Sequence, residues 1–146
     1  MKTILAPLDF SDVTDDLLAT ATELAHAFEG KLVLLHVAMP EPAFVGYDPG
    51  PVTVQEDVVH EFAEEQVKLE GIRQAITEKG TNVSVIHEEG PTLERILQVA
   101  KEQGADWIVI GSHGHTTFHQ MLVGSVAHGV LRHAPCPVVV VPSHRK

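Results

Sequence analysis

The chain has 146 residues, a length that suits a single domain (1–146) with a sizeable core. Its formal charge of -10, from 20 acidic and 10 basic residues, argues against binding to nucleic acid or anionic membranes, which needs clustered lysine and arginine. The sequence has no apolar run of about 18 residues, so no membrane span is predicted. The N-terminus lacks the features of a signal peptide, and we therefore expect a cytoplasmic protein.

Short apolar runs alternate with helical periodicity along the first part of the chain. Residues Thr3–Leu8 read as a buried strand. Ser11 is expected to cap a helix whose apolar positions recur as far as Phe28, and Gly30 is expected to end it. Leu32–Val37 reads as the second strand. The pattern so far is strand, helix, strand.

The same alternation continues to the C-terminus. Met39–Thr53 is rich in proline and glycine and is predicted to be a loop. An amphipathic helix follows over Val54–Lys79, with Val58, Phe62, Leu69, Ile72 and Ile76 on its buried side and Gly80 at its end. The remaining predicted elements are a strand (Val83–His87), a helix (Pro91–Gln103), a strand (Trp107–Ile110), a helix (Ser125–His133) and a strand (Val138–Val141).

Strands that are almost continuously apolar and separated by helices indicate a parallel sheet covered by helices on both faces. In such a sheet, ligands bind outside the carboxyl ends of the strands, where the strand order reverses. The segments that follow the first, second and fourth strands are therefore the candidate binding segments.

Asp9 lies between the first strand and the first helix. A carboxylate at this place accepts hydrogen bonds from hydroxyl or amino groups, such as those of a ribose or an adenine. The alternative interpretation is that Asp9 or Ser11 only caps the helix. Position in the sequence does not separate these interpretations.

Three glycines flank the segment after the fourth strand: Gly111, Gly114 and Gly124. Glycine lets a ligand approach the main chain, and successive N–H groups can surround an anion. Gly124 and Ser125 also begin the last helix, whose N-terminus favours phosphate. Two ordinary turns are the alternative. The Walker A and dinucleotide-binding fingerprints are both absent, which argues against P-loop enzymes and NAD or FAD.

The same segment holds the histidine pattern His113-x-His115-x-x-x-His119, which can bind zinc in an extended loop. The sequence contains no H-E-x-x-H motif, so a dedicated metal site is the weaker interpretation and no metal ligands are assigned. His36 is interpreted as a packed or hydrogen-bonded histidine. A serine nucleophile at Ser112 is disfavoured because the G-x-S-x-G elbow is missing.

The spacing Gly111-x-x-Gly114, nine residues, then Gly124-Ser125 resembles the G-2x-G-9x-G-[ST] signature of ATP-binding universal stress proteins. The segments ILAPLDFSD, LLHV, VIGSHGH and LVGSVAHGVLRHAPCPVVVVP extend the resemblance over essentially the whole chain. It implies a doubly wound, Rossmann-like α/β fold similar to the adenine nucleotide alpha hydrolases. Five parallel strands would lie in the order 3-2-1-4-5, with ATP at their carboxyl ends.

The resemblance also implies a role for individual positions. Asp9, beside Pro7 and Leu8, would meet the adenosine, and the main chain of Val37 would read the adenine edge. The ribose and phosphates would lie against Gly111, Ser112, His113, Gly114, His115 and Thr116, with Gly124, Ser125 and Val126 as the far wall. Relatives often carry lysine or arginine where His115 stands. Mg²⁺ or Mn²⁺ accompanies the phosphates in this family.

The last strand, Val138–Val141, is bare valine between two prolines. At a sheet edge its open hydrogen-bonding groups would pair with another chain, and relatives form homodimers through this strand. We expect a homodimeric sensor or regulator that binds ATP, ADP or AMP, with a regulatory protein partner that the sequence does not identify. The alternatives are a slow ATP hydrolase, with His113 or His115 as the base, and a structural dimer without ligand.

Overall fold

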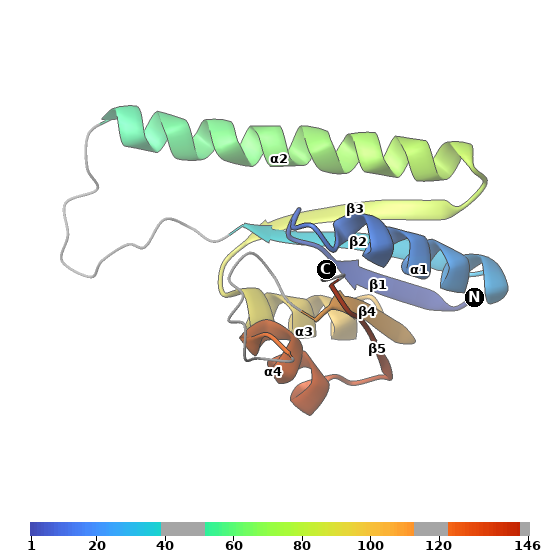
Figure 1. Cartoon of the computed structure of the whole chain (residues 1–146). Coiled ribbons are helices and arrows are strands. Elements are labelled where there is room, and N and C mark those ends of the chain that lie inside the picture. Colours follow the sequence, from blue (N-terminus) through green and yellow to red (C-terminus); the bar gives the residue numbers. More distant parts are fainter. Residues whose placement is uncertain (39–51, 113–122, 144–146) are drawn as a thin grey trace.

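The computed structural model describes residues 1–38, 52–112 and 123–143, with the backbone alone for 52–59. The predicted strands and helices are all present and differ from expectation only at their ends (Figure 1). In chain order they are β1 (Thr3–Pro7), α1 (Thr14–Ala27), β2 (Lys31–Ala38), α2 (Val52–Glu78), β3 (Asn82–Glu89), α3 (Thr92–Glu102), β4 (Trp107–Gly111), α4 (Ser125–His133) and β5 (Val138–Val141).

The five strands form one parallel sheet in the order β3-β2-β1-β4-β5, as predicted. Helices α1 and α2 lie on one face of the sheet, and α3 and α4 lie on the other (Figure 1). The strand order reverses at β1, whose neighbours are β2 and β4. A ligand is therefore expected beyond the carboxyl ends of β1 and β4.

Alternate residues of each central strand pack into two separate hydrophobic cores, one on each face of the sheet. Leu32 and Leu34 of β2 pack with α1 and α2, whereas Val33 and Leu35 pack with α3 and α4. Burying one such side chain stabilises the fold by about 1.5–3 kcal/mol. Because both faces are covered, the inner strands β1, β2 and β4 are largely apolar, which explains the continuous runs in the sequence.

The start of α1 differs from the prediction, because neither Asp9 nor Ser11 caps this helix. The N-cap position is Val13, and no side chain caps the helix. Asp9 instead accepts a hydrogen bond from the Ser11 N–H through Oδ1 (3.0 Å). Phe10 lies between them with a φ of 61°, in the left-handed region. This tight turn delays the helix and holds Asp9 at the end of β1.

The end of α1 also differs in detail. The left-handed residue after the helix is Glu29, with a φ of 49°, and not Gly30. The N–H of Gly30 closes the helix end on the Ala25 carbonyl (2.8 Å). A Cβ atom at Gly30 would overlap the carbonyl oxygen of Lys2. Glycine is needed here because β1 and the start of β2 approach each other closely.

Helix α2 is held over the sheet by one side only. Leu69 and Ile76 are buried, and Ile72 packs against them, as the periodicity predicted. Phe62 is half-buried, and the Val58 side chain lies outside the described part of the chain. Val67 is 72% exposed. Gly80 follows the helix with a φ of 92°, which confirms it as the stop. Among the described residues, no helix is both long and apolar enough to cross a bilayer.

Candidate functional site

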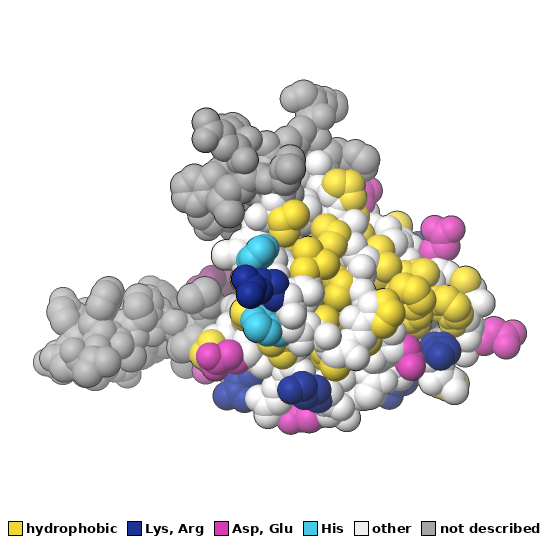
Figure 2. Space-filling view, turned by 90° about the horizontal axis from the view of Figure 1, so that it is seen from below, with side chains coloured by type: hydrophobic (Ala, Val, Ile, Leu, Met, Phe, Trp, Pro, Cys, Tyr) yellow, Lys and Arg dark blue, Asp and Glu magenta, His cyan; other side chains and the backbone are white. Residues whose placement is uncertain are grey.

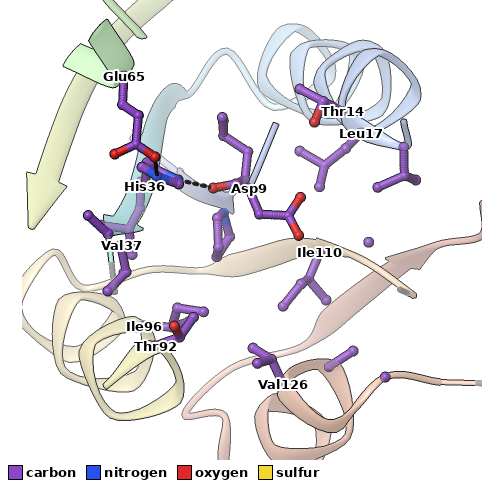
Figure 3. Close-up of a pocket in the computed structure, with 18 of the residues that line it drawn as sticks. Asp9, Thr14, Leu17, His36, Val37, Glu65, Thr92, Ile96, Ile110 and Val126 are labelled. Atoms are coloured by element: carbon purple, nitrogen blue, oxygen red, sulfur yellow. Dashed lines mark hydrogen bonds and ion pairs between the residues drawn. The ribbon is translucent and has the colours of Figure 1, made fainter. Parts of the chain in front are cut away.

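A cavity of about 560 Å³ opens at the carboxyl ends of β1, β2 and β4 (Figure 3). Small-molecule sites commonly have a volume of this order. The predicted site residues that the structure describes all line it: Pro7, Leu8, Asp9, Val37, Gly111, Ser112, Gly124, Ser125 and Val126. The other predicted residues, His113, Gly114, His115 and Thr116, lie outside the described ranges. Segments far apart in sequence therefore converge on one cavity.

Asp9 stands at the end of β1. The Leu8 N–H donates to the Leu35 carbonyl (2.8 Å), which continues the pairing of β1 with β2 up to this point. The chain then turns, and Figure 3 shows the Asp9 carboxylate pointing into the cavity. One carboxylate oxygen accepts the Ser11 N–H, and a carboxylate offers about four acceptor directions in all. The turn thus fixes the carboxylate at the cavity, where a ligand hydroxyl or amine can donate a hydrogen bond to it.

The opposite wall is built where β4 meets α4. The Gly124 N–H donates to the Ser112 carbonyl (2.6 Å), and the Ser112 N–H donates to the Val141 carbonyl (2.9 Å). These bonds place the first turn of α4 at the cavity, where Ser125 and Val126 are part of the lining. No side chain caps this helix. Its first N–H groups and its dipole therefore favour an anionic ligand group at this wall.

Between these walls the cavity is lined by apolar side chains. Val37 comes from the end of β2, one residue before Ala38, Ile96 comes from α3, and Ile110 comes from β4. Figure 3 shows them around the same space as Val126. An apolar surface with a carboxylate at one end and a helix N-terminus at the other suits a flat ring joined to an anionic group.

Helix α2 supplies a wall that the sequence did not predict. Glu61, Phe62 and Glu65 line the cavity, although the helix starts far from the glycine signature. Glu61 and Glu65 are four residues apart and share a helix face. That spacing was available in the sequence. It carried no signal, because acidic residues on a long helix ordinarily face solvent.

His36 is a hydrogen-bonded histidine, as predicted. Its Nδ1 lies 2.8 Å from the Leu8 carbonyl oxygen, and its Nε2 lies 2.7 Å from Glu65 Oε2 (Figure 3). The ring of His87 lies beside it, with ring centroids 5.4 Å apart. Burial lowers the pKa of His87, and neighbouring His36 lowers it further, against the opposing effect of Glu65. No sequence pattern predicted that these three residues meet.

Residues 1–142 match the model of the Universal stress protein family. The chain belongs to this family. Among curated universal stress proteins, YxiE of Bacillus subtilis is 33% identical over 143 residues, which cover 94% of this chain and 97% of the relative. The match spans β1 to β5, and therefore every element that surrounds the cavity.

Solved structures of universal stress proteins share the whole fold. UspA from Lactobacillus plantarum superposes with a TM-score of 0.84 at 27% identity, covering 96% of this chain and 97% of that one. Protein MJ0577 of Methanocaldococcus jannaschii gives a TM-score of 0.81 at 29% identity, covering 99% and 98% of the two chains. The strand order and the layering described above are thus those of this family.

Proposed function

We propose that this universal stress protein binds an adenine nucleotide, ATP or its products ADP and AMP, in the cavity. The observation that carries the proposal is the convergence of the described signature residues, from β1, β2, β4 and α4, on one space of suitable volume. Two proteins of the same fold support it. One is a universal stress protein in complex with cAMP (TM-score 0.68, 21% identity), and the other, from Archaeoglobus fulgidus, is in complex with dAMP (TM-score 0.67, 22% identity).

The chemistry of the cavity walls favours one orientation of the bound nucleotide. The adenine ring fits the apolar side chains near Val37, and Asp9 accepts hydrogen bonds from the adenosine moiety. The phosphates lie at the N-terminus of α4, against Gly124 and Ser125. Mg²⁺ or Mn²⁺ would bind through the phosphates, and the hydroxyl oxygens of Ser112 and Ser125 are donors that such hard ions accept.

The role that fits this site is a sensor or regulator whose conformation depends on the bound nucleotide. Asp9, the acidic residue at the end of β1, is assigned to the adenosine and not to the γ-phosphate. The candidate bases for slow hydrolysis, His113 and His115, lie outside the described ranges. A single-turnover assay with purified protein and ATP separates a binder from a hydrolase, since a binder returns the ATP intact.

Titration calorimetry with ATP, ADP and AMP tests the proposal. Gly124→Val should abolish binding, because a branched side chain would stand where the phosphates approach the main chain. Gly124 has a φ of −68° and a ψ of 165°, which valine adopts readily, so the fold should persist. Gly71→Val is the matched control, on an exposed face of α2 with open space around it. Equal nucleotide affinity in the Gly124 variant and in the control refutes the phosphate assignment.

We also propose a homodimer through β5. This strand is at the edge of the sheet, and β4 is its one neighbour among the described strands. The carbonyls of Pro137 and Val141 accept bonds from residues 108 and 112, so the alternate residues, Val138 and Val140, direct their backbone groups to the open edge. Figure 2 shows hydrophobic side chains gathered on the side of the molecule that carries α3 and α4. A second β5 strand would cover the open edge.

Val140→Pro tests the dimer, because proline removes an N–H group that points away from β4. Light scattering at micromolar concentration should show a dimer for the wild type and a monomer for the variant. Val140→Thr keeps the N–H group and should remain dimeric. A monomeric wild-type protein, or a dimeric Val140→Pro variant, contradicts pairing through β5.

A further inference from the structure

Two histidines and a glutamate meet beside the nucleotide cavity. His36 on β2 and His87 on β3 are direct partners in the register of the parallel sheet, so both side chains stand on the same face. Glu65 reaches them from α2. One ligand atom from each of the three residues lies within 4.8 Å of the others. We propose that His36, Glu65 and His87 form a binding site for one divalent transition-metal ion, of which Zn²⁺ is the type.

The contacts of His36 require a proton or a metal ion between its ring and Glu65. A carbonyl oxygen only accepts hydrogen bonds, so Nδ1, 2.8 Å from the Leu8 carbonyl oxygen, must carry the hydrogen. In a neutral ring Nε2 then presents its lone pair, yet it faces Glu65 Oε2 at 2.7 Å. Two acceptors at this distance attract each other only with a proton or a metal ion between them. The Leu8 carbonyl also orients the ring as partners of metal-bound histidines do.

His87 is the second reason. Both of its ring nitrogens are buried, and neither has a hydrogen-bond partner among the described residues. A buried polar atom without a partner costs about 1–3 kcal/mol, and such atoms often mark an unseen water or ion. Nε2 lies 3.8 Å from Glu65 Oε1, too far for a hydrogen bond but toward the same carboxylate. A metal ion between them would satisfy this nitrogen.

The donor set and the spacing fit zinc. Zinc binds imidazole nitrogen and carboxylate oxygen at about 2.0–2.2 Å, so two ligands of a tetrahedral site lie about 3.3 Å apart. The two observed distances to Glu65, 2.7 Å and 3.8 Å, bracket this value. A small rotation of the Glu65 side chain would bring its carboxylate to this distance from both rings, and the three ligand atoms, which lie within 4.8 Å of one another, would draw closer together around the ion. Three protein ligands leave a fourth position for water or a bound ligand.

The surrounding residues shield the proposed ion from solvent and leave a path by which it can enter. The Phe62 ring stacks on His87 with centroids 3.8 Å apart, and the Phe10 ring lies 4.6 Å from His36. These rings exclude solvent and hold the imidazoles in place. His36 and Glu65 also line the nucleotide cavity, which provides the path from solvent. Glu61 and Glu89 line the same cavity and add negative charge that favours a cation.

Zinc binding by the full-length protein without nucleotide tests the site. Affinity is measured by competition with a chromophoric chelator, and Co²⁺ reports the ligand geometry through its visible absorption. The wild type should bind one Zn²⁺ at this site and melt at a higher temperature when zinc is added. His87→Gln should weaken the affinity by more than about tenfold and remove the Co²⁺ band, since losing even a partner of a ligand costs about 10–100-fold. Glu65→Gln should do the same if His87→Gln folds poorly.

His60→Gln is the matched control. His60 pairs with Glu64 at 2.9 Å on the same helix, but it is 76% exposed and belongs to no metal-ligand cluster among the described residues. This variant should bind zinc as the wild type does. The combined variant His113→Gln/His115→Gln tests whether the histidines of the segment after β4 bind the metal instead. It should also keep the Co²⁺ band. The proposal is overturned if His87→Gln and Glu65→Gln bind zinc like the wild type, or if only the loop variant loses binding. Nucleotide affinity does not enter this test, so the two proposals fail independently.

Discussion

Exchanging glycine for alanine at two places should change the stability in opposite directions. In Gly30→Ala, the new Cβ would overlap the Lys2 carbonyl oxygen and lie 3.1 Å from its carbonyl carbon and 3.3 Å from the end of Ile4. The clash is with backbone, which cannot rotate away. The same carbonyl accepts the Lys31 N–H (2.8 Å), the first bond between these chain segments. Overpacking costs about 1–3 kcal/mol, and a weakened hydrogen bond adds about 1 kcal/mol.

The expected loss for Gly30→Ala is therefore about 3 kcal/mol. This loss exceeds the stabilisation of roughly 0.4–1 kcal/mol that alanine provides by lowering the conformational entropy of the unfolded chain. For a domain of this size the midpoint of thermal unfolding should fall by about 6–12 °C. Gly71→Ala, in the interior of α2 with no atom within 4 Å of the new Cβ, should instead gain about 0.5–1 kcal/mol. Circular dichroism melts and urea midpoints measure both. A Gly30→Ala midpoint at or above the wild-type value refutes this account of the β1–β2 approach.

Three further outcomes are expected. Leu69→Ala should cost about 2–5 kcal/mol in urea unfolding because Leu69 is fully buried, whereas Val67→Ala, at a 72% exposed site on the same helix, should change stability by less than about 0.5 kcal/mol. Asp9→Asn keeps an acceptor for the turn but loses the charge, so nucleotide affinity by calorimetry should fall about tenfold or more with little change in melting temperature. Burial raises the pKa of the Cys136 thiol above its ordinary 9.0, so the folded state holds this proton more tightly than the unfolded state. The stability of the wild type relative to Cys136→Ala should therefore fall as pH rises above 9.0, and an unchanged difference would contradict this.

The fold was predictable because the inner strands β1, β2 and β4 are buried on both faces. The apolar runs at Thr3–Pro7 and Val138–Val141 left few alternatives to a parallel sheet, and glycines such as Gly80 marked where helices end. The errors lie where local chemistry has more than one solution. Ser11 resembles a helix cap in the sequence, but its N–H donates to the Asp9 carboxylate and the chain forms a turn there. Gly30 looks like a left-handed stop, but Glu29 takes that conformation and Gly30 serves close packing.

The candidate site was predictable in part, for a related reason. The signature glycines follow strand ends, and the geometry of parallel strands brings such positions together, as Gly111 and Gly124 show. The wall formed by α2 was not predictable, because nothing in the sequence fixes how a long helix lies over a sheet. The pairing of His36 with His87 depends on the register of β2 against β3. Their contact with Glu65 depends on this register and on how α2 lies over the sheet. Such contacts between distant residues have no pattern that a single sequence reveals.

The central position of β1 determines when this strand can complete its pairing during translation. This strand is translated before β4, its partner on one side, and its Thr3 N–H donates to the carboxylate of Asp106, more than one hundred residues later in the chain. At a ribosomal rate of about 5–20 residues per second, that partner arrives roughly 5–20 seconds afterwards. Throughout that interval the nascent chain exposes an apolar strand with one side unpaired. A molecular chaperone that binds short apolar segments would find its target in β1.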